Sequence, residues 1–254
     1  MKTPSADSTD ADLAAALAHL AGATLLTTRE ELGAAGVTGK ALGKAGDVAA
    51  QKVIAKALEG SRPGDAVLSE EAPDDPSRLS AERVWIVDPL DGTKHFAEGK
   101  NEWAVHIALW EQGHLTVGAV ALPTEGVVLR SDEVGAPSST AGKPLRIAVS
   151  SSRTPPIARE AAQSLSATLV PMGSAGVKIA SVIRGQNDAY IHAGGQYEWD
   201  SAAPIALARA AGLHTSRLDG SDLLYNRKDP YLPDLVVTRA EIADKVTAAI
   251  ARAI

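Results

Sequence analysis

The spacing of apolar residues changes along the chain, and this change constrains the fold more than any other feature of the sequence. Near the N-terminus the apolar residues recur at helical intervals, as Leu13 and Leu17 do. Residues 66–130 instead form short apolar runs bounded by Pro, Gly and Asp, which indicates buried strands. Beyond residue 144 candidate strands and helices alternate. This order predicts layered helices and sheets in two halves.

The expected elements follow from these patterns. Thr9 and Asp12 predict a capped start for the first helix, and a second helix is expected from Asp47 to Gly60. Further helices are expected at 156–165, 174–184, 201–211 and 239–253. Strands are expected at 66–69, 83–87, 103–110, 115–122, 127–130, 145–150, 168–170, 188–192, 213–216 and 235–238.

Two segments are expected to lack regular structure. Residues 33–46 carry five glycines, which predicts a mobile loop that closes over a substrate. Residues 131–144 are small, polar and rich in Pro and Gly. We expect the boundary there, between an N-terminal half at residues 1–143 and a C-terminal half at residues 144–254.

Composition excludes several classes of function. The formal net charge is −6 and no basic tract is present, which argues against binding of a nucleic acid polymer. The chain has no cysteine, so disulfides, zinc–thiolate sites and cysteine nucleophiles are excluded. Residues 1–10 lack the features of a secretory signal, and no apolar stretch approaches the roughly 20 residues that span a bilayer. We therefore expect a cytoplasmic protein without a membrane partner.

The densest chemical signal is the run Asp88-Pro-Leu-Asp-Gly-Thr93, directly after the apolar residues 84–87. Pro and Gly favour a sharp turn, so that both carboxylates and the hydroxyl can project from one strand end. Glu70 and Glu71 follow another expected strand in the same way, and Glu198-Trp-Asp200 precedes an expected helix. Each feature alone is ordinary turn or surface chemistry. Together they could hold two hard divalent cations about 3.5–4 Å apart.

These residues carry a resemblance to a known family. Asp88–Thr93 and Trp199-Asp-Ser-Ala-Ala203 resemble the two signatures of the inositol monophosphatase superfamily. Leu68–Glu71 and Asp88–Phe96 resemble most closely its bisphosphate-nucleotidase branch, the CysQ-type enzymes. The resemblance covers nearly the whole chain. It implies a mixed α/β (α+β) fold, an αβαβα five-layer sandwich with the active site between its halves, and a family in which homodimers are common.

The resemblance also implies the roles of single residues. The metal ligands would be the side chains of Glu70, Asp88, Asp91 and Asp200 and the backbone carbonyl of Leu90, holding two or three Mg²⁺ ions. Glu70 and Thr93 would position and activate the attacking water. Asp47 would orient Thr93 or reach the metals through water. The chain reads Lys-Ala-Gly before Asp47, where the family often has a Thr-Ala run, so both roles stay open for Asp47.

Substrate contacts are expected on both sides of the metal site. The family pattern adds Asp91, Asp200 and the N–H groups of Gly92 and Thr93. Lys94 would pair with a second phosphate or remain solvated. His192 stands where inositol-specific enzymes have a Glu, and a protonated His would favour an added phosphate. The alternative is a histidine whose partners all lie within the protein. A small-residue helix start that also carries a lysine would approach a sugar or phosphate through Gly173, Ser174 and Lys178.

The predicted function is therefore a Mg²⁺-dependent phosphomonoesterase. The branch that the chain resembles removes the 3′-phosphate of 3′-phosphoadenosine 5′-phosphate to give AMP and phosphate, which implies a place in sulfate assimilation and sensitivity to lithium. The alternatives are inositol monophosphatase or fructose-1,6-bisphosphatase activity. A noncatalytic regulatory binding protein is a further alternative from a different class. The complete acidic set favours an enzyme.

Overall fold

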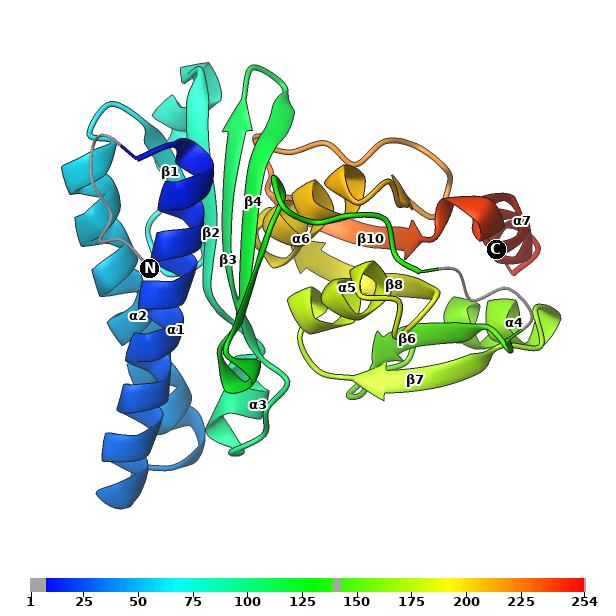
Figure 1. Cartoon of the computed structure of the whole chain (residues 1–254), viewed down its shortest axis with the longest axis horizontal. Helices are drawn as coiled ribbons and strands as arrows, with labels where there is room; N and C mark the ends of the chain where they lie inside the picture. Colours follow the sequence, from blue (N-terminus) through cyan, green and yellow to red (C-terminus); the bar gives the residue numbers. More distant parts are fainter. Residues whose placement is uncertain (1–7, 139–142, 254) are drawn as a thin grey trace.

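The computed structural model describes residues 8–138 and 143–253 as five stacked layers of helices and sheets (Figure 1). Two helices cover the outer face of the first sheet, two helices lie between the sheets, and two more cover the far face of the second sheet. The outer pair is α1 (Asp10–Ala34) and α2 (Gly39–Ser61), the middle pair is α5 (Ala175–Ile183) and α6 (Glu198–Ala210), and the far pair is α4 (Pro156–Ser164) and α7 (Ala243–Ala251). The expected αβαβα sandwich is confirmed.

The first sheet has the order β1-β2-β3-β4-β5, with β1 parallel to β2 and every other pair antiparallel. Its strands are β1 (Ala66–Ser69), β2 (Arg83–Asp91), β3 (Ala104–Glu111), β4 (His114–Leu122) and β5 (Val127–Arg130), and the short helix α3 (Thr93–Ala97) follows β2. The hydrophobic pattern predicted each of these strands, because short apolar runs separated by turn residues determine them locally.

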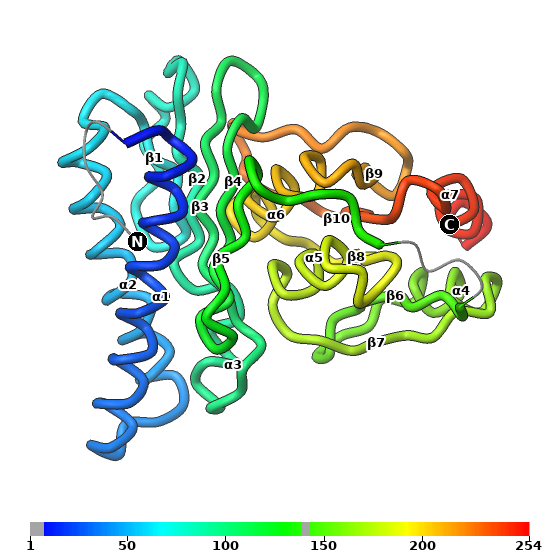
Figure 2. Tube along the Cα trace, viewed as in Figure 1, coloured from blue at the N-terminus to red at the C-terminus, as the bar shows by residue number. Residues whose placement is uncertain are grey.

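The second sheet has the order β7-β6-β8-β10-β9 (Figure 2). Its strands are β6 (Arg146–Ser150), β7 (Thr168–Met172), β8 (Ala189–Tyr197), β9 (His214–Ser216) and β10 (Tyr231–Thr238). Both β8 and β10 are longer than predicted, since they pair across a bulge at Gly194 and Gly195. Both glycines have positive φ, which L side chains rarely adopt.

The middle helix α6 brings the two halves together. Its alanines are buried against the first sheet, where an added Cβ at Gly118 would lie 2.7 Å from the carbonyl oxygen of Ala203 and from Cβ of Ala206. Small residues on both sides therefore allow the helix to approach the strand closely. The predicted start of this helix at Ser201 is wrong. Asp200 accepts a hydrogen bond from the backbone N–H of Tyr197 (2.7 Å), so Glu198 and Asp200 belong to the first turn.

The predicted loop at residues 33–46 is largely helical. α1 continues to Ala34 and α2 begins at Gly39, so only four residues separate the two helices. An added Cβ would lie 2.8 Å from Thr93 at Gly43 and 2.8 Å from the Phe96 ring at Gly46. These glycines therefore allow close packing of α2 against α3. Asp47 lies inside α2 and not at its start.

The remaining differences are smaller. The expected helix at 239–253 is a short 3-10 turn (Ala240–Ile242) followed by α7. Part of the expected boundary segment, residues 139–142, and residues 1–7 of the N-terminus lie outside the described residues. Contrary to expectation, α1 is long and apolar enough to cross a membrane by length and composition. Its Leu13, Leu17 and Leu25 are fully buried among residues of the first sheet and α2, which makes it a core helix in this fold.

Candidate metal centre and active site

Four carboxylates from three segments converge at one edge of the first sheet. Because β1 and β2 are parallel, the residues that follow them meet at the same edge, where the N–H of Glu70 donates to the carbonyl of Val87 (3.3 Å). Asp88 and Asp91 lie at the end of β2, and α6 adds Asp200. One oxygen from each of these three aspartates lies within 4.8 Å of the others. Three of the predicted ligands therefore come together in space, and the charge of Glu70 acts on the same cluster.

Asp88 has an oxygen without a hydrogen-bond partner among the described residues. Its Oδ1 accepts a hydrogen bond from the N–H of Leu90 (2.9 Å), whereas Oδ2 is buried and accepts none. A buried, unpaired carboxylate oxygen is strongly unfavourable unless a cation binds it. Burial raises the pKa of Asp88 well above its ordinary value, and the neighbouring charge of Glu70 adds to this.

Glu70 and Asp200, in the same cluster, also have raised pKa values. Burial, followed by the charge of Asp200, raises the pKa of Glu70 to about 7. Burial, followed by the charge of Asp91, raises the pKa of Asp200 to about 7. Several carboxylates held together in a buried site are stable in their ionised form only beside a cation. Their oxygen donors suit a hard divalent ion, so the residues fit the metal that the sequence predicts.

Asp91 is held from both halves of the molecule. Its Oδ2 accepts hydrogen bonds from the hydroxyl of Ser174 (2.5 Å) and from the N–H of Gly176 (2.7 Å), both at the start of α5. The Nε2 atom of His106 lies 3.3 Å from the same oxygen. The protein thus surrounds one oxygen of this carboxylate with its own groups, which leaves Oδ1 available for a metal.

His106 is a residue of the site that sequence reasoning missed. It is fully buried in β3, and its Nδ1 lies 3.2 Å from the carbonyl oxygen of Trp199. The imidazole therefore lies between Asp91 and the first turn of α6, next to Asp200, and its Nε2 atom makes no hydrogen bond within the described residues. Burial lowers the pKa of His106, which favours the neutral ring. The available signal was a polar residue inside the apolar run of β3, from Ala104 to Leu109.

Thr93 and Asp47 meet beside the metal ligands. The hydroxyl oxygen of Thr93 lies 3.3 Å from Oδ1 of Asp47 and 3.0 Å from the carbonyl oxygen of Leu90. Burial, followed by the charge of Glu71, raises the pKa of Asp47 to about 6. Gly92 has a φ of 93°, so the chain turns sharply as predicted, and the short helix α3 then begins at Thr93.

Two of the predicted substrate contacts, Gly173 and Lys178, are bonded to other groups of the protein and do not face a substrate. Lys178 is buried, and its Nζ donates to the carbonyls of Gly173 (3.2 Å) and Ser174 (2.5 Å). Its ammonium group therefore braces the turn before α5 and is not open to solvent. Burial lowers the pKa of Lys178 to about 8. The N–H of Gly173 donates to Oε2 of Glu102 (2.9 Å), which uses the donor that was expected to reach the substrate.

His192 also lies in surroundings other than those expected, whereas the exposed Lys94 fits both of the roles expected for it. Nε2 of His192 lies 3.2 Å from the carbonyl oxygen of Gly195, and burial lowers the pKa of the ring. The structure therefore favours a neutral His192, and not the protonated form that was expected to attract phosphate. Lys94 is 72% exposed, and the nearest carboxylate oxygen, on Glu98, is 3.9 Å from its Nζ.

Comparisons with known proteins agree with this geometry. The model of the inositol monophosphatase family matches residues 8–254. A 3′-phosphoadenosine 5′-phosphate phosphatase from Mycobacterium leprae (strain TN) is 53% identical over 251 residues, which cover 94% of this chain and 92% of the relative. The 3′(2′),5′-bisphosphate nucleotidase CysQ of Escherichia coli (strain K12) is 33% identical over 199 residues, covering 74% and 81%.

The solved structures give the same answer for the fold. The crystal structure of CysQ from Bacteroides thetaiotaomicron superimposes with a TM-score of 0.74 at 26% identity, covering 90% of this chain and 96% of that one. The inositol monophosphatase from Anabaena sp. PCC 7120 superimposes with a TM-score of 0.74 at 24% identity, covering 95% of each chain. The chain therefore belongs to the inositol monophosphatase family, as a phosphatase that hydrolyses phosphate esters.

Proposed function

We propose that this protein is a Mg²⁺-dependent phosphatase that removes the 3′-phosphate of 3′-phosphoadenosine 5′-phosphate, giving AMP and phosphate. The observation that carries the metal-dependent chemistry is the convergence of Asp88, Asp91 and Asp200, with a buried carboxylate oxygen left unpaired. The substrate is supported by the 53% identity to the Mycobacterium leprae enzyme of that name. A place in sulfate assimilation follows from the same likeness.

The proposed ligands are Glu70, Asp88, Asp91, Asp200 and the carbonyl of Leu90, for two or three Mg²⁺ ions. When bound, such ions neutralise the phosphate and lower the pKa of a coordinated water. The chain's own residues orient the reaction. The hydroxyl of Thr93 donates a hydrogen bond to Asp47, and its oxygen lone pairs then face the attacking water as acceptors. Glu70 lies beside the cluster and accepts the second proton of that water.

The substrate would lie between the two halves. The N–H groups of Gly92 and Thr93 face its phosphate oxygens, and Asp91 and Asp200 stand beside them. Ser174 contributes through the turn before α5, because its hydroxyl holds Asp91 (2.5 Å). Gly173 and Lys178 support that turn from within. We expect His192 to contact the sugar or the base as a neutral ring, and Lys94 to contact a second phosphate.

The test is Mg²⁺-dependent phosphate release from three substrates: 3′-phosphoadenosine 5′-phosphate, inositol 1-phosphate and fructose 1,6-bisphosphate. The variant Asp91→Asn is the inactive control. We expect the nucleotide to be preferred by at least about tenfold, equal to about 1.4 kcal/mol of discrimination. Equal or faster release from either sugar phosphate would replace the nucleotide with the inositol monophosphatase or fructose-1,6-bisphosphatase alternative. A folded protein that releases no phosphate from any of them would instead favour the noncatalytic regulator.

Four further proposals accompany this function. The likeness to bacterial CysQ enzymes supports a cytoplasmic location and inhibition by lithium. It also supports a homodimer, which sedimentation would test. We propose that residues 1–143 and 144–254 form the two halves, with the division between β5 and β6.

A further inference from the structure

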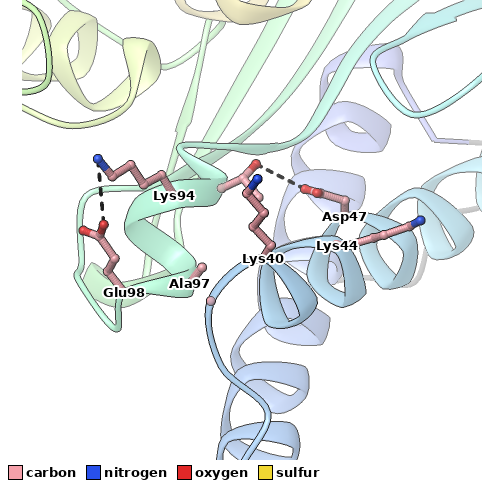
Figure 3. Close-up of a pocket in the computed structure, with 9 residues that line it drawn as sticks. Lys40, Lys44, Asp47, Lys94, Ala97 and Glu98 are labelled. Atoms are coloured by element: carbon pink, nitrogen blue, oxygen red, sulfur yellow. Dashed lines mark hydrogen bonds and ion pairs between the residues drawn. The ribbon is translucent and has the colours of Figure 1, made fainter.

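A cavity of about 530 Å³ lies between α2 and α3, beside the proposed reaction site (Figure 3). Its walls share Asp47 and Thr93 with that site, so the cavity begins where the attacking water is expected. Of the residues that line the cavity, the proposed function uses three: Asp47, Thr93 and Lys94. The full lining is Gly39, Lys40, Gly43, Lys44, Asp47, Thr93, Lys94, Ala97 and Glu98.

Positive charge predominates around this cavity. Lys40 and Lys44 on α2 are exposed, one helical turn apart, and neither has an ion pair within the described residues 8–138 and 143–253. Figure 3 shows the Lys40 side chain running toward Asp47, whereas the side chains of Lys44 and Lys94 extend away from Asp47 on opposite sides. Of the two carboxylates, Asp47 lies within hydrogen-bonding distance of Thr93. Glu98 forms an ion pair at 2.7 Å with Lys100, which does not line the cavity. Its contact with Lys94 is longer, at 3.9 Å.

The cavity wall also lets an anion approach the backbone. Gly39 and Gly43 contribute no side chain, and α2 begins at Gly39 without a hydrogen bond from the side chain of Thr38. The N–H groups of its first turn are therefore not capped by that residue. A helix start of this kind adds to the field of the three lysines, because unpaired N–H groups carry partial positive charge.

We propose that this cavity is a phosphate-binding subsite, in which Lys40 binds a dianionic phosphate group and the exposed side chains of Lys44 and Lys94 turn toward it on binding. A phosphate offers enough acceptor oxygens for several ammonium groups at once, whereas a carboxylate offers two. The inference rests on the proposed function, which provides two sources for the group. One is the second phosphate of a bisphosphate substrate, and the other is the inorganic phosphate that the reaction releases.

The chain offers a closely matched control for the test. The double variant K40A/K44A removes two exposed lysines at positions i and i+4 of α2. The double variant K52A/K56A removes two exposed lysines with the same spacing from the same helix, away from the cavity lining. Both change the net charge and the helix propensity equally. Equal melting temperatures would show that both double variants fold.

Two readouts separate the two sources of phosphate, both at saturating Mg²⁺. Chromatography measures the dephosphorylated product, which is AMP from the bisphosphate and adenosine from adenosine 3′-phosphate. The first is KM for 3′-phosphoadenosine 5′-phosphate beside KM for adenosine 3′-phosphate, which lacks the second phosphate. The second is inhibition by added inorganic phosphate. If the substrate's second phosphate binds here, K40A/K44A raises only the bisphosphate KM, by about three- to tenfold, and high salt reduces the effect. If the released phosphate binds here, the inhibition constant rises by a similar factor while both KM values hold.

Either result supports the subsite and identifies its ligand. The proposal is overturned if K40A/K44A and K52A/K56A behave alike in both readouts. A failure of the proposed function would look different, because then the unchanged protein would not release phosphate from either nucleotide. In that case calorimetric titration of inorganic phosphate into the Mg²⁺-loaded variants still tests the subsite. Equal affinity in the two double variants would overturn it.

Discussion

The substitution Gly176→Ala tests how tightly the start of α5 holds the metal ligand Asp91. It adds one methyl group at a position where an ideal Cβ would lie 2.0 Å from Nε2 of His106. Ordinary van der Waals contact begins near 3.4 Å, so the helix and the ring must separate by about 1.4 Å. The ring has little room to yield, because it is fully buried between Trp199 and Asp91. We therefore expect α5 to move.

Movement of α5 has two consequences of different size. Overpacking of this kind costs about 1–3 kcal/mol of folding stability. The N–H of Gly176 donates a hydrogen bond to Asp91 at 2.7 Å, and we expect this distance to increase by about as much as the helix moves. A misplacement of about 1 Å in a catalytic group typically costs about 10²-fold in rate. We expect kcat/KM to fall by about that factor, and the Mg²⁺ concentration for half-maximal activity to rise.

The assay combines phosphate release across a Mg²⁺ titration with thermal unfolding of the same samples. Gly33→Ala in α1 is the control, since no atom lies within 4 Å of its ideal Cβ and the change there is expected to stabilise slightly. A Gly176→Ala enzyme that keeps kcat/KM within twofold and an unchanged Mg²⁺ dependence would refute the reasoning. The clash also predicts coupling: once His106→Ala has removed the ring, adding Gly176→Ala should cost little further stability.

Three other predictions follow from the site and its surroundings. Thr93→Ala removes the hydroxyl that contacts Asp47, and kcat should fall by about 10²–10³-fold with little change in melting temperature; a loss below fivefold in a phosphate-release assay would count against its role. Glu70 and Asp200 have pKa values raised to about 7, so the stability they contribute to the metal-free protein is present below about pH 4 and is lost as pH rises through 7. The melting-temperature increase caused by Mg²⁺ should therefore be larger at pH 7.5 than at pH 5.5, and calorimetry showing the reverse order would contradict this. Arg78 is 1% exposed and donates to Asp74, Asn226 and the carbonyl of Arg227, so Arg78→Met should lower the free energy of unfolding in urea by about 2–5 kcal/mol; a loss under 1 kcal/mol would contradict its structural role.

The turn chemistry and the apolar periodicity of the sequence determined much of this molecule. The run from Asp88 to Thr93 predicted a sharp turn after a buried strand, and β2 followed by α3 has that form. The short apolar runs predicted the strands of both sheets, because alternation and turn residues act over a few neighbouring positions. The resemblance of the acidic motifs to a known family indicated which of these carboxylates could hold a divalent ion.

Tertiary structure alone decided the use of several residues that looked ordinary or flexible in the sequence. Gly43 and Gly46 allow two helices to pack closely, although the number of glycines in residues 33–46 predicted a mobile loop. Lys178 is buried against backbone carbonyls, and His106 lies against a metal ligand in the middle of an apolar strand. The hydrogen bond between Gly176 and Asp91 joins residues 85 positions apart. Such contacts depend on which surfaces the folded layers bring together, and the local patterns that specify helices, strands and turns carry no information about that pairing.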